Sequence, residues 1–185
     1  MIGLKSYLPK LEVFTGLTAE MLYERQRKLV ARGSLEASPG RGPGSGVRAD
    51  ANSLSTFLIS LLAHDLLVEA FMVDPIGWMK STQARCPFTG KTSLKDALEA
   101  ILNSQKLAER VELVSVNRNA QTGFIDYLSK RVGTSRQILR SEFANKGLMK
   151  FVPLAPSGME TIKSLRPNLI KQIADDIASF KRSET

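Results

Sequence analysis

Apolar side chains recur at helical spacing in the first thirty residues of the chain. Leu8, Leu11 and Phe14 predict a helix that ends at Gly16, which can take a left-handed conformation. A second helix is expected over residues 18–32, with Thr18 as its cap and Gly33 ending it. One face of this helix is mainly apolar and carries Ala19, Leu22, Gln26, Leu29 and Val30. The opposite face is charged and carries Glu20, Glu24, Arg27 and Lys28, with Tyr23 and Arg32 at its edges.

A glycine-rich segment, GRGPGSGVR at residues 40–48, follows the second helix. It is expected to be a loop, because glycine loses much backbone entropy in regular structure and proline lacks an N–H donor. Short strands are predicted on both sides of the loop, over residues 34–38 and 46–50. A cap at Asp50 or Asn52 and an apolar helix come next. This element order is typical of a winged helix-turn-helix, and it favours a wing over a simple linker.

Residues 54–73 form the longest apolar run of the chain. Polar residues interrupt this run, and its uncharged part is shorter than the roughly 20 apolar residues that a membrane span needs. Apolar side chains all round a helix predict burial on every side. That burial comes either from the C-terminal part of the same chain or from a second copy, and we expect a symmetric homodimer.

Alternating apolar residues in the second half predict strands. Residues 110–128 form two strands around a polar turn, and residues 136–156 form another pair. A helix is expected over residues 93–111, capped by Thr89 or Thr92, and closing helices over 157–165 and 167–180. An alternative remains, because Phe124, Leu128, Val132, Leu139 and Phe143 also fit helical spacing. With Gly133 and Ser135 they would form a second helix-turn-helix. Strands are favoured because residues 111–116 need a sheet partner.

The predicted fold class is α+β. It begins with a winged helix-turn-helix over residues 1–64, continues through a helical connector or dimerisation region over 65–108, and ends in a small α+β domain over 109–185.

Residues 5–64 resemble the winged helix-turn-helix DNA-binding domains, most closely the MerR and excisionase type. The matching residues are Gly16, Thr18, Leu22, Tyr23, Glu24, Gly33, Leu35 and Arg48. The chain departs from the family's pattern in a longer second helix and in a wing that is richer in glycine and lacks the usual aromatic residue. The resemblance implies DNA binding, with the second helix in the major groove and the wing beside the backbone.

Charge and composition agree with a polyanionic partner. The chain of 185 residues has a formal net charge of +8 and a sequence pI of about 9.8, with the positive charge concentrated in residues 1–50 and 101–150. One cysteine excludes an internal disulfide and a multi-cysteine zinc site. No signal peptide is recognisable, so we expect a cytoplasmic protein.

The sequence offers no pattern that favours catalysis. The segment GRGPGSGVR has no lysine, and Arg85 stands where a Walker A loop before Lys91 would need its first glycine. His64 and Cys86 are each the only residue of their type and are expected to pack in the core. We therefore expect no enzyme, no cofactor and no metal site.

The expected function is that of a DNA-binding transcriptional regulator. The proposed DNA contacts in the second helix are Thr18, Glu20, Tyr23, Glu24, Arg27 and Lys28, and those in the wing are Arg41, Ser45 and Arg48. The carboxylates of Glu20 or Glu24 can accept a hydrogen bond from cytosine. Two alternatives stay open: an architectural or phage-type packaging or excision factor, and a protein–protein interaction module without DNA binding.

Overall fold

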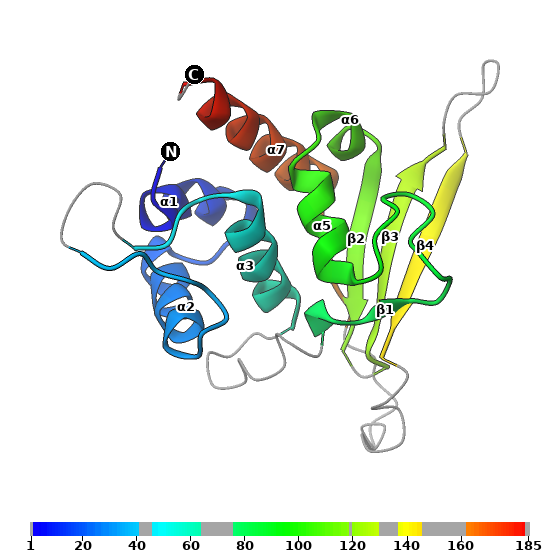
Figure 1. The fold of residues 1–185 in the computed structure, drawn as a ribbon, viewed down its shortest axis with the longest axis horizontal. Helices are drawn as coiled ribbons and strands as arrows, with labels where there is room; N and C mark the ends of the chain where they lie inside the picture. The colour runs from blue at the N-terminus through cyan, green and yellow to red at the C-terminus, as the bar shows by residue number, and fades with distance from the viewer. Residues whose placement is uncertain are drawn as a thin grey trace.

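Three helices form the N-terminal part of the chain: α1 (Leu4–Thr15), α2 (Ala19–Ala31) and α3 (Ala51–Ala63). The computed structural model describes residues 2–40, 46–63, 76–118, 120–129, 137–145 and 162–183. α3 begins after Asp50, whose Oδ1 accepts a hydrogen bond from the Ser53 N–H at 2.8 Å, so the predicted cap is Asp50. Figure 1 shows these helices grouped on one side of a sheet.

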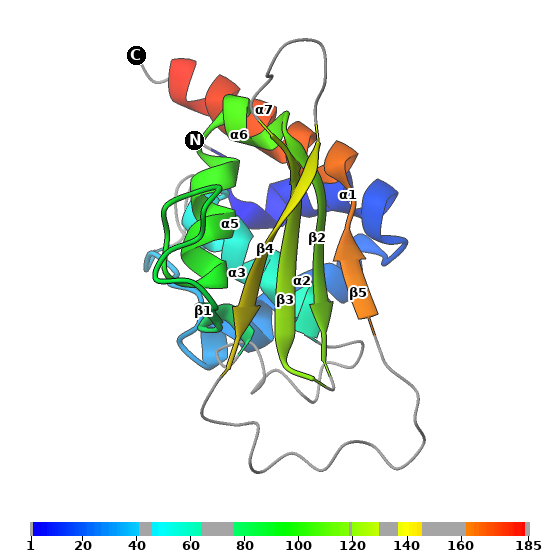
Figure 2. The same cartoon turned by 90° about the vertical axis from the view of Figure 1, so that its right-hand side faces the viewer.

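The sheet has five described strands: β1 (Lys80–Ser81), β2 (Val111–Asn117), β3 (Thr122–Leu128), β4 (Ile138–Ala144) and β5 (Ile162–Leu165). They lie in the order β1-β4-β3-β2-β5, and every neighbouring pair is antiparallel. Helices α5 (Leu94–Leu102), α6 (Gln105–Ala108) and α7 (Pro167–Arg182) lie on one face. Figure 2 looks onto the other face, over which no described helix lies. The chain is therefore α+β, as the sequence predicts.

The hairpin of β2 and β3 confirms the strands expected over residues 111–128. Phe124 lies in β3, and Leu139 and Phe143 lie in the paired strand β4, so the alternative second helix-turn-helix is wrong. Its Gly133 and Ser135 lie outside the described residues. Strands form here because β2 pairs with β3 on one side and with β5 on the other. Its valines are buried in the sheet that results.

Three other expected elements differ in the structure. Residues 162–165 form strand β5 and not a helix, because they pair with β2 and bury Leu165. α5 is capped by Ser93 and not by Thr89 or Thr92: the Ser93 Oγ accepts a hydrogen bond from the Asp96 N–H at 3.2 Å. The single helix expected over 93–111 breaks at Asn103, after which Ser104 caps α6. The second strand expected within 136–156 lies outside the described residues.

α3 is the central helix of the core. It packs against α5 and reaches β2 and β5. Its apolar side chains are buried within the single chain, with 1% exposure or less for Leu54, Phe57, Leu58, Ile59 and Leu62. Residues 54–63 are therefore buried without a second copy, and their apolar excess does not by itself support the predicted homodimer. Residues 64–73 lie outside the described part of the chain.

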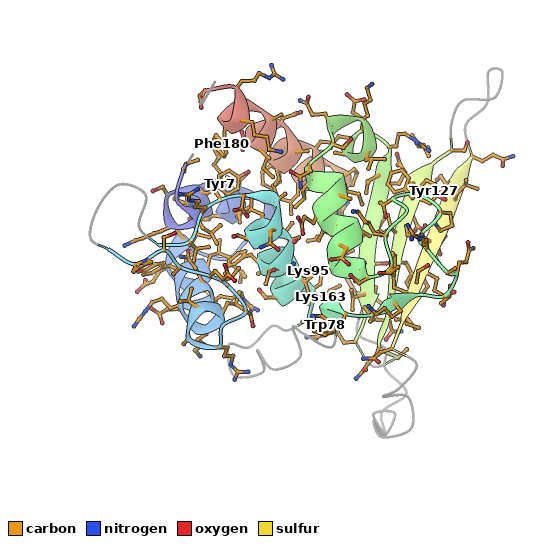
Figure 3. All side chains as sticks on the ribbon, in the orientation of Figure 1. Tyr7, Trp78, Lys95, Tyr127, Lys163 and Phe180 are labelled. Carbon is orange, nitrogen blue, oxygen red and sulfur yellow. The ribbon has the colours of Figure 1, made fainter. Side chains whose placement is uncertain are left out.

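Polar contacts connect α1 and α3 to the rest of the molecule, and α2 to α3. The Tyr7 hydroxyl of α1 donates a hydrogen bond to Asp176 Oδ2 of α7 at 2.8 Å, and Lys10 Nζ lies 3.1 Å from the same carboxylate. Tyr7 also packs edge-on against Phe180, and Figure 3 shows the two rings side by side where α1 meets α7. At the end of α3, the Ser60 carbonyl accepts from Arg25 at 2.7 Å and the Ala63 carbonyl from Arg118 at 3.3 Å. No described helix is long and apolar enough to cross a membrane.

Candidate nucleic-acid interface

The turn between α1 and α2 is short and fixed at both ends. Gly16 has a φ of 68°, and its N–H donates to the Glu12 carbonyl, which ends α1. The Thr18 Oγ1 accepts a hydrogen bond from the Met21 N–H at 3.3 Å, as predicted for the cap of α2. The Glu12 carboxylate accepts from the Ala19 N–H at 3.1 Å and so closes the same end of α2 from the preceding helix. These contacts set the angle between the two helices.

The inner face of α2 anchors the helix to the core. Leu22 and Leu29 are fully buried and Gln26 nearly so, as the sequence predicts. Arg25 was expected on the solvated face of the helix because of its charge, but its side chain is buried. Its guanidinium Nη1 donates a hydrogen bond to the Ser60 carbonyl of α3 at 2.7 Å. α2 is therefore held on the core by both apolar and polar contacts.

The outer face of α2 carries the predicted contact residues. Glu20 and Arg27 are exposed, and Glu24, Lys28 and Tyr23 are half-buried. The Arg27 Nη1 lies 2.8 Å from the Glu24 Oε1, and this hydrogen bond raises the pKa of Arg27 above its ordinary value. Two of the predicted contacts therefore neutralise each other in the free protein.

Tyr23 lies at the edge of this face and takes part in the packing. Its ring lies against the core, and the Lys5 Nζ of α1 sits 4.5 Å from the ring centroid. Lys5 thereby adds a cation beside α2 that the sequence did not suggest, because the contact joins two different helices.

Backbone hydrogen bonds hold the chain together on both sides of the glycine-rich segment. Ser38 and Gly46 exchange both hydrogen bonds, at 3.0 and 2.8 Å. The chain after Gly46 pairs with the N-terminal segment, since the Leu4 N–H donates to the Val47 carbonyl at 2.7 Å. The strands predicted over 34–38 and 46–50 are thus reduced to isolated bridges. Arg48 is exposed between buried neighbours, whereas Arg41 and Ser45 lie outside the described residues.

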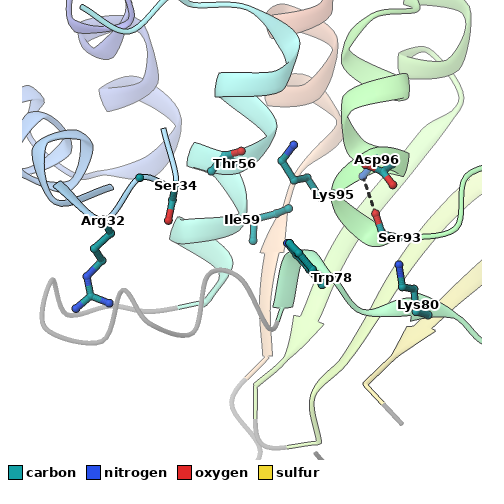
Figure 4. Close-up of a pocket in the computed structure, with 11 residues that line it drawn as sticks. Arg32, Ser34, Thr56, Ile59, Trp78, Lys80, Ser93, Lys95 and Asp96 are labelled. Carbon is teal, nitrogen blue, oxygen red and sulfur yellow. Dashed lines mark hydrogen bonds between the residues drawn. The ribbon is translucent and has the colours of Figure 1, made fainter. Parts of the chain in front are cut away.

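Two adjoining hollows run from this hairpin across α3. The first, of about 520 Å³, lies between the end of α2 and the hairpin and is lined among others by Ser34, Arg48 and Asp50. The second, also about 520 Å³, continues past Thr56 to the start of α5. Gly33, Ser34, Thr56 and Lys95 line both. Figure 4 shows the second hollow, with Arg32 on one side and Trp78 and Lys80 on the other.

Sequence reasoning missed Trp78, Lys80 and Lys95 as members of this surface. They follow the apolar run, far from α2 in sequence, and only the packing of α3 between α2 and α5 brings them near Arg32. An available signal was the single tryptophan of the chain, placed in the polar stretch WMKSTQ.

The residues considered for catalysis do not form a site in the described part of the chain. Cys86 is buried, and its Sγ lies 3.3 Å from the Ser141 Oγ. His64 lies outside the described residues. Among the residues that the structure describes, no group of histidine, cysteine and carboxylate side chains is placed to hold a metal ion.

Comparisons with known proteins give no relative for this chain. No family model matches it, and searches of curated proteins and of solved structures found no significant match.

Proposed function

We propose that the chain binds double-stranded DNA through its N-terminal helices, as a transcriptional regulator, with α2 as the recognition helix and residues 40–48 as a wing. The observation that carries this proposal is the arrangement around α2. A tight capped turn precedes the helix, its inner face is anchored in the core, and its charged face is exposed. The exposed Arg48 lines the same hollow as the residues that end α2, so a duplex on α2 would also meet the base of the hairpin.

Each residue of the interface has a role in this proposal. Tyr23 and Glu20 in the first half of α2 lie at base edges, and Arg27 and Lys28 contact phosphates or guanine. Arg27 exchanges the Glu24 carboxylate for a phosphate, or Glu24 accepts from cytosine beside it. Thr18 lies at the start of the helix near the backbone. Arg41, Ser45 and Arg48 hold the wing on phosphates or in the minor groove.

The test measures duplex binding against salt. Fluorescence anisotropy with a labelled random duplex gives the slope of log affinity against log salt, which falls by about 0.9 for each phosphate contact removed. The double variant Arg27→Ala/Lys28→Ala should weaken binding and lower the slope by about 2 if both side chains contact phosphate. The control Lys106→Ala/Lys171→Ala removes the same charge from α6 and α7, away from α2 (Figure 1). It should leave the slope unchanged.

The Glu24–Arg27 pair gives the second candidate function its support. A surface on which acidic and basic side chains already neutralise each other suits a protein partner better than a polyanion. Duplex affinity that is equal in the wild type and in the double variant would favour this interaction module. A regulator is distinguished from an architectural factor by selection of binding sites, because a regulator enriches one short operator and an architectural factor enriches phased or bent DNA.

A homodimer remains part of the proposal, because one helix reads few base pairs and paired half-sites raise affinity and specificity. A candidate surface lies at the groove between the end of α1 and β5, where Val13 is 82% exposed and Phe14 43%. Light scattering of the protein at tens of micromolar, with and without a selected DNA site, measures whether its molar mass is that of a monomer or of a dimer.

A further inference from the structure

Among the described residues, Trp78 is the aromatic side chain most exposed to solvent. It is 67% exposed, although both its neighbours in the segment 76–79 are anchored. Ile76 and Met79 are buried, and the Met79 carbonyl accepts a hydrogen bond from the Leu94 N–H at 3.0 Å. The next residue, Lys80, belongs to β1 and bridges to Ser93. Trp78 is therefore presented to solvent from a fixed backbone and not from a loose end.

The backbone that carries the indole lies close to α3 and α5. A Cβ placed on Gly77 would lie 3.6 Å from the Ile59 Cδ1 and 3.6 Å from the Lys95 Cβ. The segment that carries Trp78 thus rests directly on α3 and α5. An aromatic ring held outward on a rigid base loses little conformational freedom when a flat partner stacks on it.

Cations flank the indole on both sides of the open hollow. Arg32, at the end of α2, and Lys80, in β1, are exposed and lie on opposite sides of Trp78 (Figure 4). Lys95 contributes mainly its stem, since its Nζ donates to the Asn52 Oδ1 at 2.6 Å and lies 3.8 Å from Glu99. Among the described residues, Asp96 is the acidic member of this lining, and Glu36 and Asp50 line the adjoining hollow at the hairpin. An aromatic surface between two cations is the arrangement that single-stranded nucleic acids use, with bases on the ring and phosphates on the cations.

The shape of the hollow favours a strand over a mononucleotide. It is open to solvent and continues into the hollow at the hairpin, where Arg48 adds a further cation. A small ligand is usually enclosed over most of its surface, whereas a strand needs an open groove with charges spaced along it. The paired bases of a duplex are already stacked on one another, so they offer no free face to the Trp78 indole.

We infer that the hollow from Arg48 to Trp78 binds single-stranded nucleic acid, with an unpaired base on Trp78 and phosphates on Arg32 and Lys80. This inference rests on the proposed function in one respect: both sites would bind nucleic acid. The hollow begins at the end of α2, so the two sites adjoin. It would hold a strand that has been separated from the duplex next to the helix.

The experiment uses Trp78 as its own reporter, because the chain contains no other tryptophan. A thymidine 12-mer is titrated into the full chain while tryptophan emission is recorded, in parallel with anisotropy of the labelled oligomer. Stacking should quench the emission in a saturable manner. Heparin, a polyanion without bases, should compete for the cations without quenching the emission in the same way.

Variants separate stacking from charge. Trp78→Ala should weaken oligomer binding by about 5- to 150-fold, the range measured for one base stacked on an aromatic ring, and Trp78→Phe should restore most of it. Ile138→Ala is the matched control, since Ile138 is 66% exposed, close to the value for Trp78, but lies in β4 and has no part in either proposal. Arg32→Ala and Lys80→Ala should each lower the salt slope by about 0.7.

The possible outcomes distinguish the single-strand site from the recognition helix. Single-strand binding that survives in Arg27→Ala/Lys28→Ala, while duplex binding is lost, supports both. Single-strand binding by a chain that never binds a duplex supports the hollow and refutes the recognition helix. The hollow is refuted if Trp78→Ala, folded by circular dichroism, binds the oligomer like the wild type. Oligomer or heparin binding with equal effects on emission would also refute stacking.

Discussion

Replacing Tyr7 by phenylalanine tests the contact between the two ends of the chain. Tyr7→Phe keeps the ring that packs against Phe180 and removes only the hydroxyl that donates to Asp176 at 2.8 Å. The side chain is buried, so water cannot replace the lost donor. The variant should fold and be less stable than the wild type.

The magnitude follows from the partners of the carboxylate. A hydrogen bond to a charged acceptor contributes about 1.5–3 kcal/mol. Lys10 and Gln172 still donate to Asp176 in the variant, at 3.1 and 3.2 Å, so the lower end applies. We expect a loss of about 1.5 kcal/mol in the free energy of unfolding at pH 8, which corresponds to a melting temperature about 3–6 °C lower for a chain of this size.

Alkaline pH adds a second signature. Burial, and then the hydrogen bond to the negatively charged Asp176, raise the pKa of Tyr7 well above its ordinary value. A group with a raised pKa stabilises the fold below its unfolded pKa, here about 10, and that stability is lost as pH rises further. The loss reaches about 1.4 kcal/mol per pH unit, so the difference between wild type and Tyr7→Phe should nearly vanish by pH 11.

Urea unfolding at pH 8, 9, 10 and 11 measures both effects, provided that the slope with denaturant is the same in the two proteins. Tyr23→Phe is the control, because it removes a phenol of α2 and leaves every partner of Asp176 in place. A difference that stays constant from pH 8 to 11, or that is absent at pH 8, would refute the role given to the Tyr7 hydroxyl.

Two further changes test the α2 surface and the core. Glu24→Gln should raise affinity for a random duplex about two- to fivefold at low salt, because it frees Arg27 and removes a negative charge. Anisotropy measures this, and unchanged affinity would contradict it; weaker binding of a selected site alone would instead mark Glu24 as a base contact. Leu62→Glu should abolish folding and not yield folded monomers, because a carboxylate in the core costs several kcal/mol. Circular dichroism would contradict this if it gave a native spectrum with wild-type stability.

Features that depend on neighbouring residues could be predicted from the sequence. The ends of α1 and α2 follow from Gly16 and Thr18, whose backbone conformation and hydroxyl act within a few residues. The apolar residues Val111, Leu113 and Val116 predicted β2, and the polar turn after them predicted the hairpin. Local chemistry was sufficient for these elements, and also for the charged outer face of α2.

Features that depend on distant partners could not be predicted. Residues 162–165 become a strand because the edge of β2 is free to pair with them. Arg25 is buried because the end of α3 places a carbonyl within reach of its guanidinium. The grouping of Trp78 and Lys80 with Arg32 requires α3 to lie between the segments that carry them. Periodicity alone contains none of this information.

The hydrogen bond between Tyr7 and Asp176 also has a consequence for synthesis on the ribosome, because its partners are 169 residues apart. At about 5–20 residues per second, the acceptor is made roughly 10–30 s after the donor. During that interval α1 lacks both the carboxylate of α7 and the Phe180 ring, and the core around α3 lacks β5 for most of it. The N-terminal helices, although made first, thus reach their final packing only when the last helix has left the ribosome. Until then their apolar surface is open to chaperones.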